Sequence, residues 1–260
     1  MRIYLINLER RKDRLQAMED QAGALGLVQE RVTAVDAGTV ERGVLDRWFA
    51  AGGPLGEIPA GDKACFLSHR TAWEKFIASG QPHAVFLEDD VRLSGAAAPM
   101  LASDGWIPAG VEVVKLEHYG PPGQRVLLAD IHAAGEGLKM GRMLSRHTGA
   151  AAYILSRAAA ELLLRQTRFD LPVDHLLFNP NNSRLFARLR PWQLLPAIAR
   201  QTQFVGEKSD IEKTRAGLRA FGWTYARREL VRFGYDLKLV PAQIGALLSG
   251  AKFVPVRTAD

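Results

Sequence analysis

Three adjacent carboxylates, Glu88, Asp89 and Asp90, directly follow the apolar run at residues 84–87. A short apolar run bounded by turn residues predicts a buried strand, and open α/β sheets bind ligands beyond the carboxyl ends of their strands. Adjacent negative charges repel one another unless a cation compensates them, and carboxylate oxygens suit Mg²⁺ and Mn²⁺. The sequence therefore predicts a divalent metal site, which could in turn hold the diphosphate of a nucleotide-linked substrate.

The extended backbone determines which of these acids act together. Successive side chains of a strand point to opposite sides, so we expect Glu88 and Asp90 on one side and Asp89 on the other. One ion would then be held by one or two of the acids, with water or backbone completing its ligands. The alternative is a solvated acidic turn, because Asp is common in turns.

A second polar group lies between the first expected strand, residues 3–8, and the helix that follows it. Asn7, Arg11 and Arg14 bring an amide and two cations to this βα turn. Doubly wound sheets bind nucleotides at such turns, and helix N-termini favour anions. We expect these residues to contact a nucleotide, and Asp36, after the second strand, to bind a ribose hydroxyl. The alternatives are a solvated helix face with internal Arg–Asp pairs and an Asp that only starts a turn.

Two further candidate positions lie on expected helices. Ser68 and His69 lie about one turn before Trp73, and we predict that a half-buried His69, with Ser68 beside it, orients a phosphate or a carboxylate at the site. A hydrogen-bonded histidine at the edge of the core is the alternative for His69. Asp174 follows Pro172 at a helix start and is predicted to be the general base that deprotonates an acceptor hydroxyl. Alternatively, Asp174 is an acid that the helix dipole stabilises.

The order of the expected elements predicts an α/β fold. Four strands alternate with helices at residues 3–8, 32–35, 84–87 and 111–116. Such alternation favours βαβ units and a mainly parallel sheet flanked by helices. Residues 126–155 are rich in strand signals, and Ser156 is expected to cap a helix. We place the main domain at residues 1–203 and a basic, helical C-terminal appendage at residues 204–260.

The composition limits the class of protein. The chain has 260 residues, of which 47% are hydrophobic and 24% charged, and this fits a soluble α/β domain with a small appendage. The lone Cys65 excludes an internal disulfide and fits a reducing cytoplasm. We expect neither a signal peptide nor a membrane-spanning segment.

The net charge of +6 predicts an anionic partner, which could be a nucleic acid, a membrane surface or a phosphorylated glycan. The sequence has no phosphate-binding P-loop, no Gly-x-Gly-x-x-Gly behind a strand and no zinc-like Cys/His cluster. Its basic residues are not interleaved with aromatic residues in the way that nucleic-acid binding favours. We therefore expect no nucleic-acid partner.

Taken in order, these motifs resemble those of glycosyltransferase family 25, which includes bacterial lipooligosaccharide galactosyl- and glucosyltransferases. The resemblance covers about residues 1–203. It rests on Ile6-Asn7-Leu8 with Asp13-Arg14, Ala34-Val35-Asp36, Cys65-Phe66-Leu67-Ser68-His69 with Trp73, Leu87-Glu88-Asp89-Asp90, Thr148-Gly149-Ala150 with Tyr153 and Ser156, Pro172-Val173-Asp174, and Pro196 with Gln201.

The resemblance implies a GT-A-like fold, a nucleotide-sugar donor that is usually a UDP-hexose, a divalent metal (Mn²⁺ or Mg²⁺) and inversion at the anomeric carbon. It implies that the acidic motif carries the metal, with Asp90 as the direct ligand and Glu88 beside it. The expected function is the transfer of a hexose, galactose or glucose, to a hydroxyl of a lipooligosaccharide core or a related glycan. One departure is Ala64, where the family often has Gly, and this could alter donor contacts.

Two other classes of function stay open. One is a non-catalytic module of the same fold that binds a glycan or a nucleotide sugar. The other is a metal-dependent phosphohydrolase, which would need further acids or histidines around a second metal, and the sequence has no obvious set.

The C-terminal segment has two interpretations as well. It could bind the anionic inner face of the cytoplasmic membrane peripherally, or it could pack as an ordinary helical tail. The membrane interpretation rests on Lys213, Arg215, Arg219, Arg227, Arg228 and Arg232 among Leu230, Leu237, Leu247 and Leu248.

Overall fold

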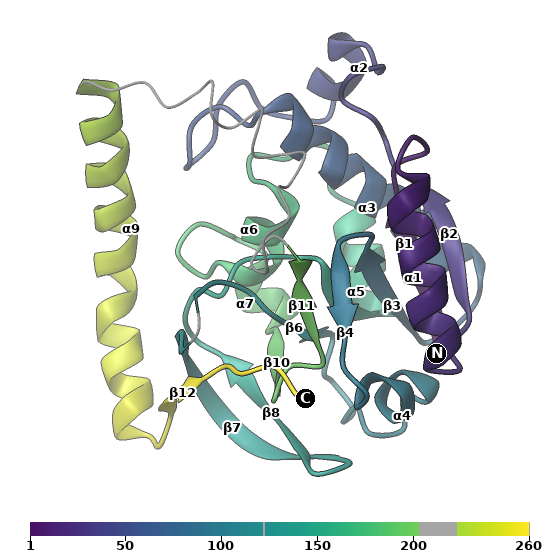
Figure 1. Cartoon of the computed structure of the whole chain (residues 1–260). Coiled ribbons are helices and arrows are strands. Elements are labelled where there is room, and N and C mark those ends of the chain that lie inside the picture. The colour runs from purple at the N-terminus through teal and green to yellow at the C-terminus, as the bar shows by residue number, and fades with distance from the viewer. Residues whose placement is uncertain (122, 203–222, 260) are drawn as a thin grey trace.

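The computed structural model describes residues 1–121, 123–202 and 223–259, and shows an α/β protein built around a large twisted sheet (Figure 1). The described helices are α1 (Lys12–Ala24), α2 (Arg42–Asp46), α3 (Ala60–Ala78), α4 (Ala97–Ala102), α5 (Arg157–Leu164), α6 (Val173–Phe178), α7 (Phe186–Leu189) and α9 (Trp223–Leu248). The described strands are β1 (Arg2–Asn7), β2 (Gln29–Thr33), β3 (His83–Glu88), β4 (Val91–Leu93), β5 (Val113–Lys115), β6 (Glu117–His118), β7 (Arg125–Gly135), β8 (Leu138–Met143), β9 (Ala152–Ser156), β10 (Trp192–Leu195), β11 (Ala199–Gln201) and β12 (Lys252–Pro255).

Within these described residues, nine strands form one sheet in the order β12-β7-β8-β10-β5-β9-β3-β1-β2, and β4-β11-β6 form a second, smaller sheet. Strands β2, β1 and β3 run parallel, as do β5 and β10. The other pairings of the large sheet are antiparallel. The α/β class is thus confirmed, but the prediction of a mainly parallel sheet is wrong. An apolar run indicates a strand buried on both faces, and it carries no information on the direction of its neighbour.

The strand alternation of β1 and β3 distributes their side chains between two apolar cores. Tyr4 and Phe86 belong to the core beneath α3 and α5, whereas Ile3 and Val85 belong to the core beneath α1 and α4. Figure 1 shows α1 on the near side of these strands and α3 and α5 on the far side. Helices on both faces leave the carboxyl ends of β1 and β3 as the edge at which a ligand can approach.

The C-terminal residues return to the large sheet. Strand β12 pairs antiparallel with β7, and Val256 behind it is fully buried in the core beneath α3. The backbone of Ala197 donates to the carbonyl of Arg257 at 2.8 Å and accepts from Ala259 at 2.7 Å. Residues 251–259 therefore belong to the main body, although the sequence analysis placed them in the C-terminal appendage.

Among the residues that the structure describes, no helix combines the length and the apolar character needed to cross a membrane.

We predict that Val256→Ala lowers the free energy of unfolding by about 2 kcal/mol, because it removes two buried methyl groups and leaves a cavity. Lys252→Ala is the control, since its exposed side chain lies on β12 itself, and it should change stability by less than about 0.5 kcal/mol. Urea unfolding measures both values. Equal stability of V256A and the parent would contradict the integration of the C-terminal strand into the core.

Candidate functional site

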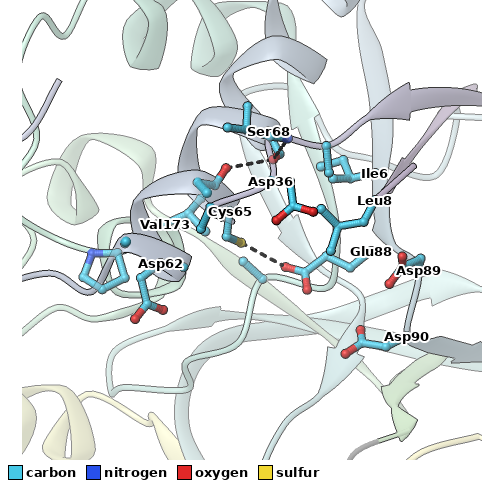
Figure 2. A pocket seen from close by; sticks show the side chains of 18 of the residues that line it. Ile6, Leu8, Asp36, Asp62, Cys65, Ser68, Glu88, Asp89, Asp90 and Val173 are labelled. Atoms are coloured by element: carbon cyan, nitrogen blue, oxygen red, sulfur yellow. Dashed lines mark hydrogen bonds between the residues drawn. The ribbon is translucent and has the colours of Figure 1, made fainter. Parts of the chain in front are cut away.

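A cavity of about 680 Å³ opens where β1 and β3 end. Figure 2 shows acidic side chains from several elements gathered around it. It is also lined by the loop after β2, by the first turns of α3 and α6, and by the end of β11. Seven of the predicted site residues line it, namely Arg14, Asp36, Ser68, Glu88, Asp89, Asp90 and Asp174. Three others do not, namely Asn7, Arg11 and His69.

Asp89 is held by cationic and amide groups from the first βα unit. Arg14 Nη1 donates to Asp89 Oδ1 at 3.0 Å, and Asn7 Nδ2 donates to Asp89 Oδ2 at 2.8 Å. Asn7 is itself fixed, because its Oδ1 accepts a hydrogen bond from Arg31 at 3.0 Å. The side chains of Arg14 and Asp89 are only 12% and 10% exposed. Asn7 thus lies behind the cavity wall and positions residues 88–90, which we call the acidic loop.

Glu88 extends toward the cavity from the end of β3. Its Oε1 lies 3.1 Å from His69 Nε2 and 3.8 Å from Cys65 Sγ. Burial, together with the like charges of Asp89 and Asp174, raises the pKa of Glu88 to about 7. His69 is completely buried behind this carboxylate, and so it touches Glu88 and not the cavity.

Asp90 is the acid whose charge is least compensated by hydrogen bonds. Its side chain is buried, and Oδ1 has no hydrogen-bond partner among the residues that the structure describes. Burial and the nearby Glu88 carboxylate raise the pKa of Asp90 well above its ordinary range. In Figure 2 the carboxyl groups of Glu88 and Asp90 extend to the same side of the chain. A buried carboxylate oxygen without a donor is a good ligand for a hard cation.

These observations fit a divalent cation between Glu88 and Asp90. A second group of donor atoms, on Cys65, His69 and Glu88, lies within 4.8 Å of one another. Burial raises the pKa of the Cys65 thiol well above its ordinary value. Because the thiolate is the form that binds metals, this second group does not suit a cation. The pair of carboxylates remains the better candidate metal site.

The cationic wall of the cavity shares only Arg14 with the prediction. Arg10 and Arg42 line the cavity together with Arg14. The guanidinium of Arg11 instead pairs with Asp13 at 2.8 Å, outside the lining. Adjacent arginines of a βα turn point in different directions, and sequence alone could not distinguish them.

Asp36 and Ser68 brace the loop after β2. Arg10 Nε donates to Asp36 Oδ2 at 2.7 Å, which lowers the pKa of that carboxyl. The Ser68 hydroxyl accepts from the Val35 backbone N–H and donates to the Ala64 carbonyl, both at 2.8 Å. Ser68 therefore links this loop to α3, and Asp36 presents its carboxyl at the cavity wall.

Asp174 occupies the first turn of α6 on the wall of the cavity. Its Oδ1 accepts from the His175 backbone N–H at 2.8 Å, and its Oδ2 lies 3.5 Å from the Gly149 backbone nitrogen. The carboxylate therefore lies at the start of the helix, where backbone N–H groups are directed at it. The carboxyl group nevertheless lines the same cavity as Glu88 and Asp90, which a base for an acceptor hydroxyl requires.

Sequence analysis missed a fully buried ion pair beside the site. Lys115 Nζ lies 2.7 Å from Glu117 Oε1 and 2.5 Å from the Gly149 carbonyl oxygen. Glu117 Oε1 also accepts from the Ala151 backbone at 2.9 Å. The pair therefore holds the segment whose Gly149 faces Asp174. Two charged residues at the end of an expected strand, with Leu116 between them, are the signal in the sequence, and they resemble a solvated strand end.

The raised pKa of Glu88 predicts a pH-dependent stability. The ordinary pKa is 4.5 and the folded value is about 7. Between these values the folded state binds a proton that the unfolded state has lost, so the contribution of Glu88 to the free energy of unfolding falls as pH rises. Glu88→Gln removes this titration. When a chelator is present, the free energy of unfolding of E88Q minus that of the parent should increase from about pH 5 to about pH 8.

Urea unfolding at each pH measures this difference. A hydrogen bond that the introduced amide cannot make lowers the stability of E88Q by the same amount at every pH, so it does not change the trend. Glu19→Gln on the exposed side of α1 is the matched control and should show no trend. A pH-independent difference for E88Q would show that Glu88 is not perturbed.

Comparisons with known proteins identify relatives of the chain. The sequence profile described as glycosyltransferase family 25 (LPS biosynthesis protein) matches residues 1–177. The lacto-N-neotetraose biosynthesis glycosyltransferase LgtB of Neisseria gonorrhoeae is 34% identical over 154 residues, which are 54% of this chain and 52% of that protein. LgtE of the same organism is 28% identical over 204 residues, 71% of this chain and 69% of that protein.

The lipooligosaccharide biosynthesis protein lic2B of Haemophilus influenzae is 27% identical over 143 residues, which are 50% of this chain and 52% of that protein. The matched part of the chain thus spans about half the length of LgtB and lic2B. The family profile covers well over half of the 260 residues and includes most of the residues that line the cavity. The protein belongs to glycosyltransferase family 25.

Proposed function

We propose that the protein is a metal-dependent, inverting glycosyltransferase of GT-A-like fold. It would transfer a hexose, galactose or glucose, from a UDP-sugar to a hydroxyl of a lipooligosaccharide core or a related glycan. The observation that carries this proposal is the pairing of two under-compensated acids, Glu88 and Asp90, with Arg10, Arg14 and Arg42 around one cavity. A diphosphate needs both a cation held by carboxylates and further positive charge.

The charged residues named above have distinct roles in this proposal. Glu88 and Asp90 would hold the cation, and the cation would neutralise the charge that develops on the leaving nucleoside diphosphate. Arg14 lies at the cavity wall and also anchors Asp89, so the acidic loop stays in register with the donor site. Asp36, held by Arg10, accepts a hydrogen bond from a ribose hydroxyl.

Asp174 is the proposed base. As the acceptor oxygen forms its bond to the anomeric carbon, the bond from that carbon to the phosphate oxygen breaks on the opposite side. The proton of the acceptor hydroxyl passes to Asp174, and the configuration at the anomeric carbon inverts. The bonds from Gly149 and from the start of α6 keep the carboxylate oriented.

The proposed function is tested by incubating the purified protein with a panel of nucleotide sugars, with Mn²⁺ or with chelator, and measuring the released nucleoside diphosphate. We expect metal-dependent release from one donor. Asp90→Asn should lower that release by at least about 10²-fold, because a neutral amide cannot replace a charged ligand of a hard cation. Circular dichroism confirms that the variant is folded.

Asp130→Asn is the matched control, because Asp130 is an exposed Asp paired with Arg142 away from the cavity. It should keep full activity. Retention of most turnover in D90N would contradict the metal assignment. Binding of a donor without turnover by the parent, with or without a glycan acceptor, would favour the non-catalytic alternative.

We also propose that α9 contacts an anionic membrane on the cytoplasmic side, where a lipid-linked acceptor would be found. Lys213, Arg215 and Arg219 lie outside the described residues, and the side chains of Arg227, Arg228, Leu230 and Arg232 are likewise not described. The support lies farther along α9, where a stripe of large apolar side chains is exposed at Leu237, Val240, Ile244 and Leu247. Spacing of three and four residues places them on one helix face, as an interfacial helix requires.

We predict that Leu237→Gln with Ile244→Gln lowers the fraction of protein that sediments with vesicles of phosphatidylethanolamine and phosphatidylglycerol several-fold. Point variants are needed because deletion of the whole segment would also remove β12 from the sheet. Val28→Gln is the control, since Val28 is 87% exposed in the loop before β2. Equal sedimentation of the double variant and the parent would refute the membrane contact.

A further inference from the structure

A buried chain of hydrogen bonds connects the core to Glu88. Trp73 Nε1 lies 2.9 Å from the Tyr153 hydroxyl, which lies 2.7 Å from His69 Nδ1. His69 Nε2 then lies 3.1 Å from Glu88 Oε1. The side chains of Trp73, Tyr153 and His69 are all completely inaccessible to solvent. Water therefore cannot substitute for any of these three side chains.

The chemistry of the groups favours one direction for every bond. An indole N–H can only donate, so the Tyr153 oxygen accepts from Trp73. The single proton of the phenol is then available for His69 Nδ1, which accepts it in this arrangement. A ring nitrogen that accepts a hydrogen bond carries no proton, so the imidazole is neutral when Nδ1 accepts from the phenol. The one proton of the imidazole is thus on Nε2, where it is donated to Glu88.

We infer that Tyr153 and Trp73 set the tautomer of His69, and that His69 is thereby a positioning residue that holds Glu88 for the cation. The second part of this inference rests on the proposed function, and the first part does not. In the opposite tautomer, the lone pair of Nε2 would face the carboxylate oxygen and repel it. A ligand of a metal is commonly oriented by such hydrogen bonds from residues that do not touch the metal.

Two separate features of the fold hold these four residues in place, namely the spacing of residues along α3 and the pairing of β9 with β3. His69 and Trp73 are four residues apart on α3, so their side chains lie on one face of the helix. Strand β9 pairs with β3 such that Tyr153 lies opposite Phe86, two residues before Glu88. The Tyr153 ring stacks on both Phe86, at 5.2 Å, and His69, at 5.6 Å between centroids. The phenol therefore cannot turn away from the imidazole.

The chain leaves one oxygen of Glu88 for the cavity. The imidazole bond and the thiol contact of Cys65 both end on Oε1. A carboxylate with Oε1 fixed from behind presents Oε2 as the oxygen for a ligand in front. Loss of the bond from His69 would let the carboxylate rotate and would weaken the site without removing a ligand.

Tyr153→Phe tests the inference, because it removes the phenol proton and keeps the ring. Nitrogen-15 NMR of the imidazoles, assigned by comparison with a His69 variant, should show the Nε2–H tautomer of His69 in the parent. In Y153F a substantial population of the Nδ1–H tautomer should appear. The affinity for Mn²⁺ alone, measured by calorimetry, should fall about 10- to 100-fold, the usual effect of removing a partner that orients a metal ligand.

Tyr4→Phe is the matched control. Tyr4 is equally buried and stacks on the same Phe86 ring at 5.7 Å, but its hydroxyl faces the Lys75 carbonyl and not His69. It should leave both the tautomer and the Mn²⁺ affinity unchanged. His69→Gln, whose amide N–H can still donate to Glu88, should keep most of the affinity, whereas His69→Leu should lose as much as Y153F or more.

The outcomes separate this inference from the proposed function. An Nδ1–H tautomer in the parent, or an unchanged His69 spectrum in Y153F, would overturn the inference whether or not Mn²⁺ binds. Equal Mn²⁺ affinity of H69L and H69Q would overturn the positioning role. A parent that binds no Mn²⁺ but shows the expected tautomer and its loss in Y153F would uphold the hydrogen-bond chain and refute the metal-dependent function.

Discussion

Three neighbouring carboxylates at a largely desolvated sheet edge must each be compensated, and the site is built around this electrostatic constraint. Asp89 is compensated by the guanidinium of Arg14 and the amide of Asn7. Glu88 is held by a neutral imidazole, which orients it without cancelling its charge. Asp90 has a buried oxygen to which no described group forms a hydrogen bond. The charge that remains is localised on the two acids that extend toward the cavity, where a cation would stabilise them most strongly.

The surrounding elements follow from this distribution of charge. The turn between β1 and α1 delivers the groups that bind Asp89, and α3 delivers His69 from the other face of the sheet. Strand β9 inserts antiparallel beside β3 and brings Tyr153 behind the imidazole. The buried pair of Lys115 and Glu117 fixes the segment before β9, and this segment faces the proposed base. The acidic residues after β3 and the segment before β9 that faces Asp174 are thus both connected to the large sheet.

Much of this arrangement could be predicted because it depends on local pattern. The strand before Glu88, the helix that carries His69 and the N-cap at Ser156 all follow from the periodicity or type of nearby residues. Strand direction and the insertion of β9 depend on partners distant in sequence, which an apolar run does not specify. The choice of Arg10 over Arg11 as a lining residue, and the burial of Lys115, depend likewise on tertiary packing. Most of the residues predicted from the sequence thus line one cavity, and only the structure separates groups that line it from groups behind its wall.

The central claim is that Glu88 and Asp90 together bind a divalent cation that in turn holds a nucleotide diphosphate. Crystals grown with Mn²⁺ and UDP, measured near the manganese absorption edge, test it directly through the anomalous signal of the metal. The account predicts one strong peak within coordination distance, about 2.0–2.3 Å, of carboxylate oxygens of Asp90 and Glu88 and of the diphosphate. A peak bound elsewhere, or a nucleotide bound in this cavity without any metal peak, would contradict it.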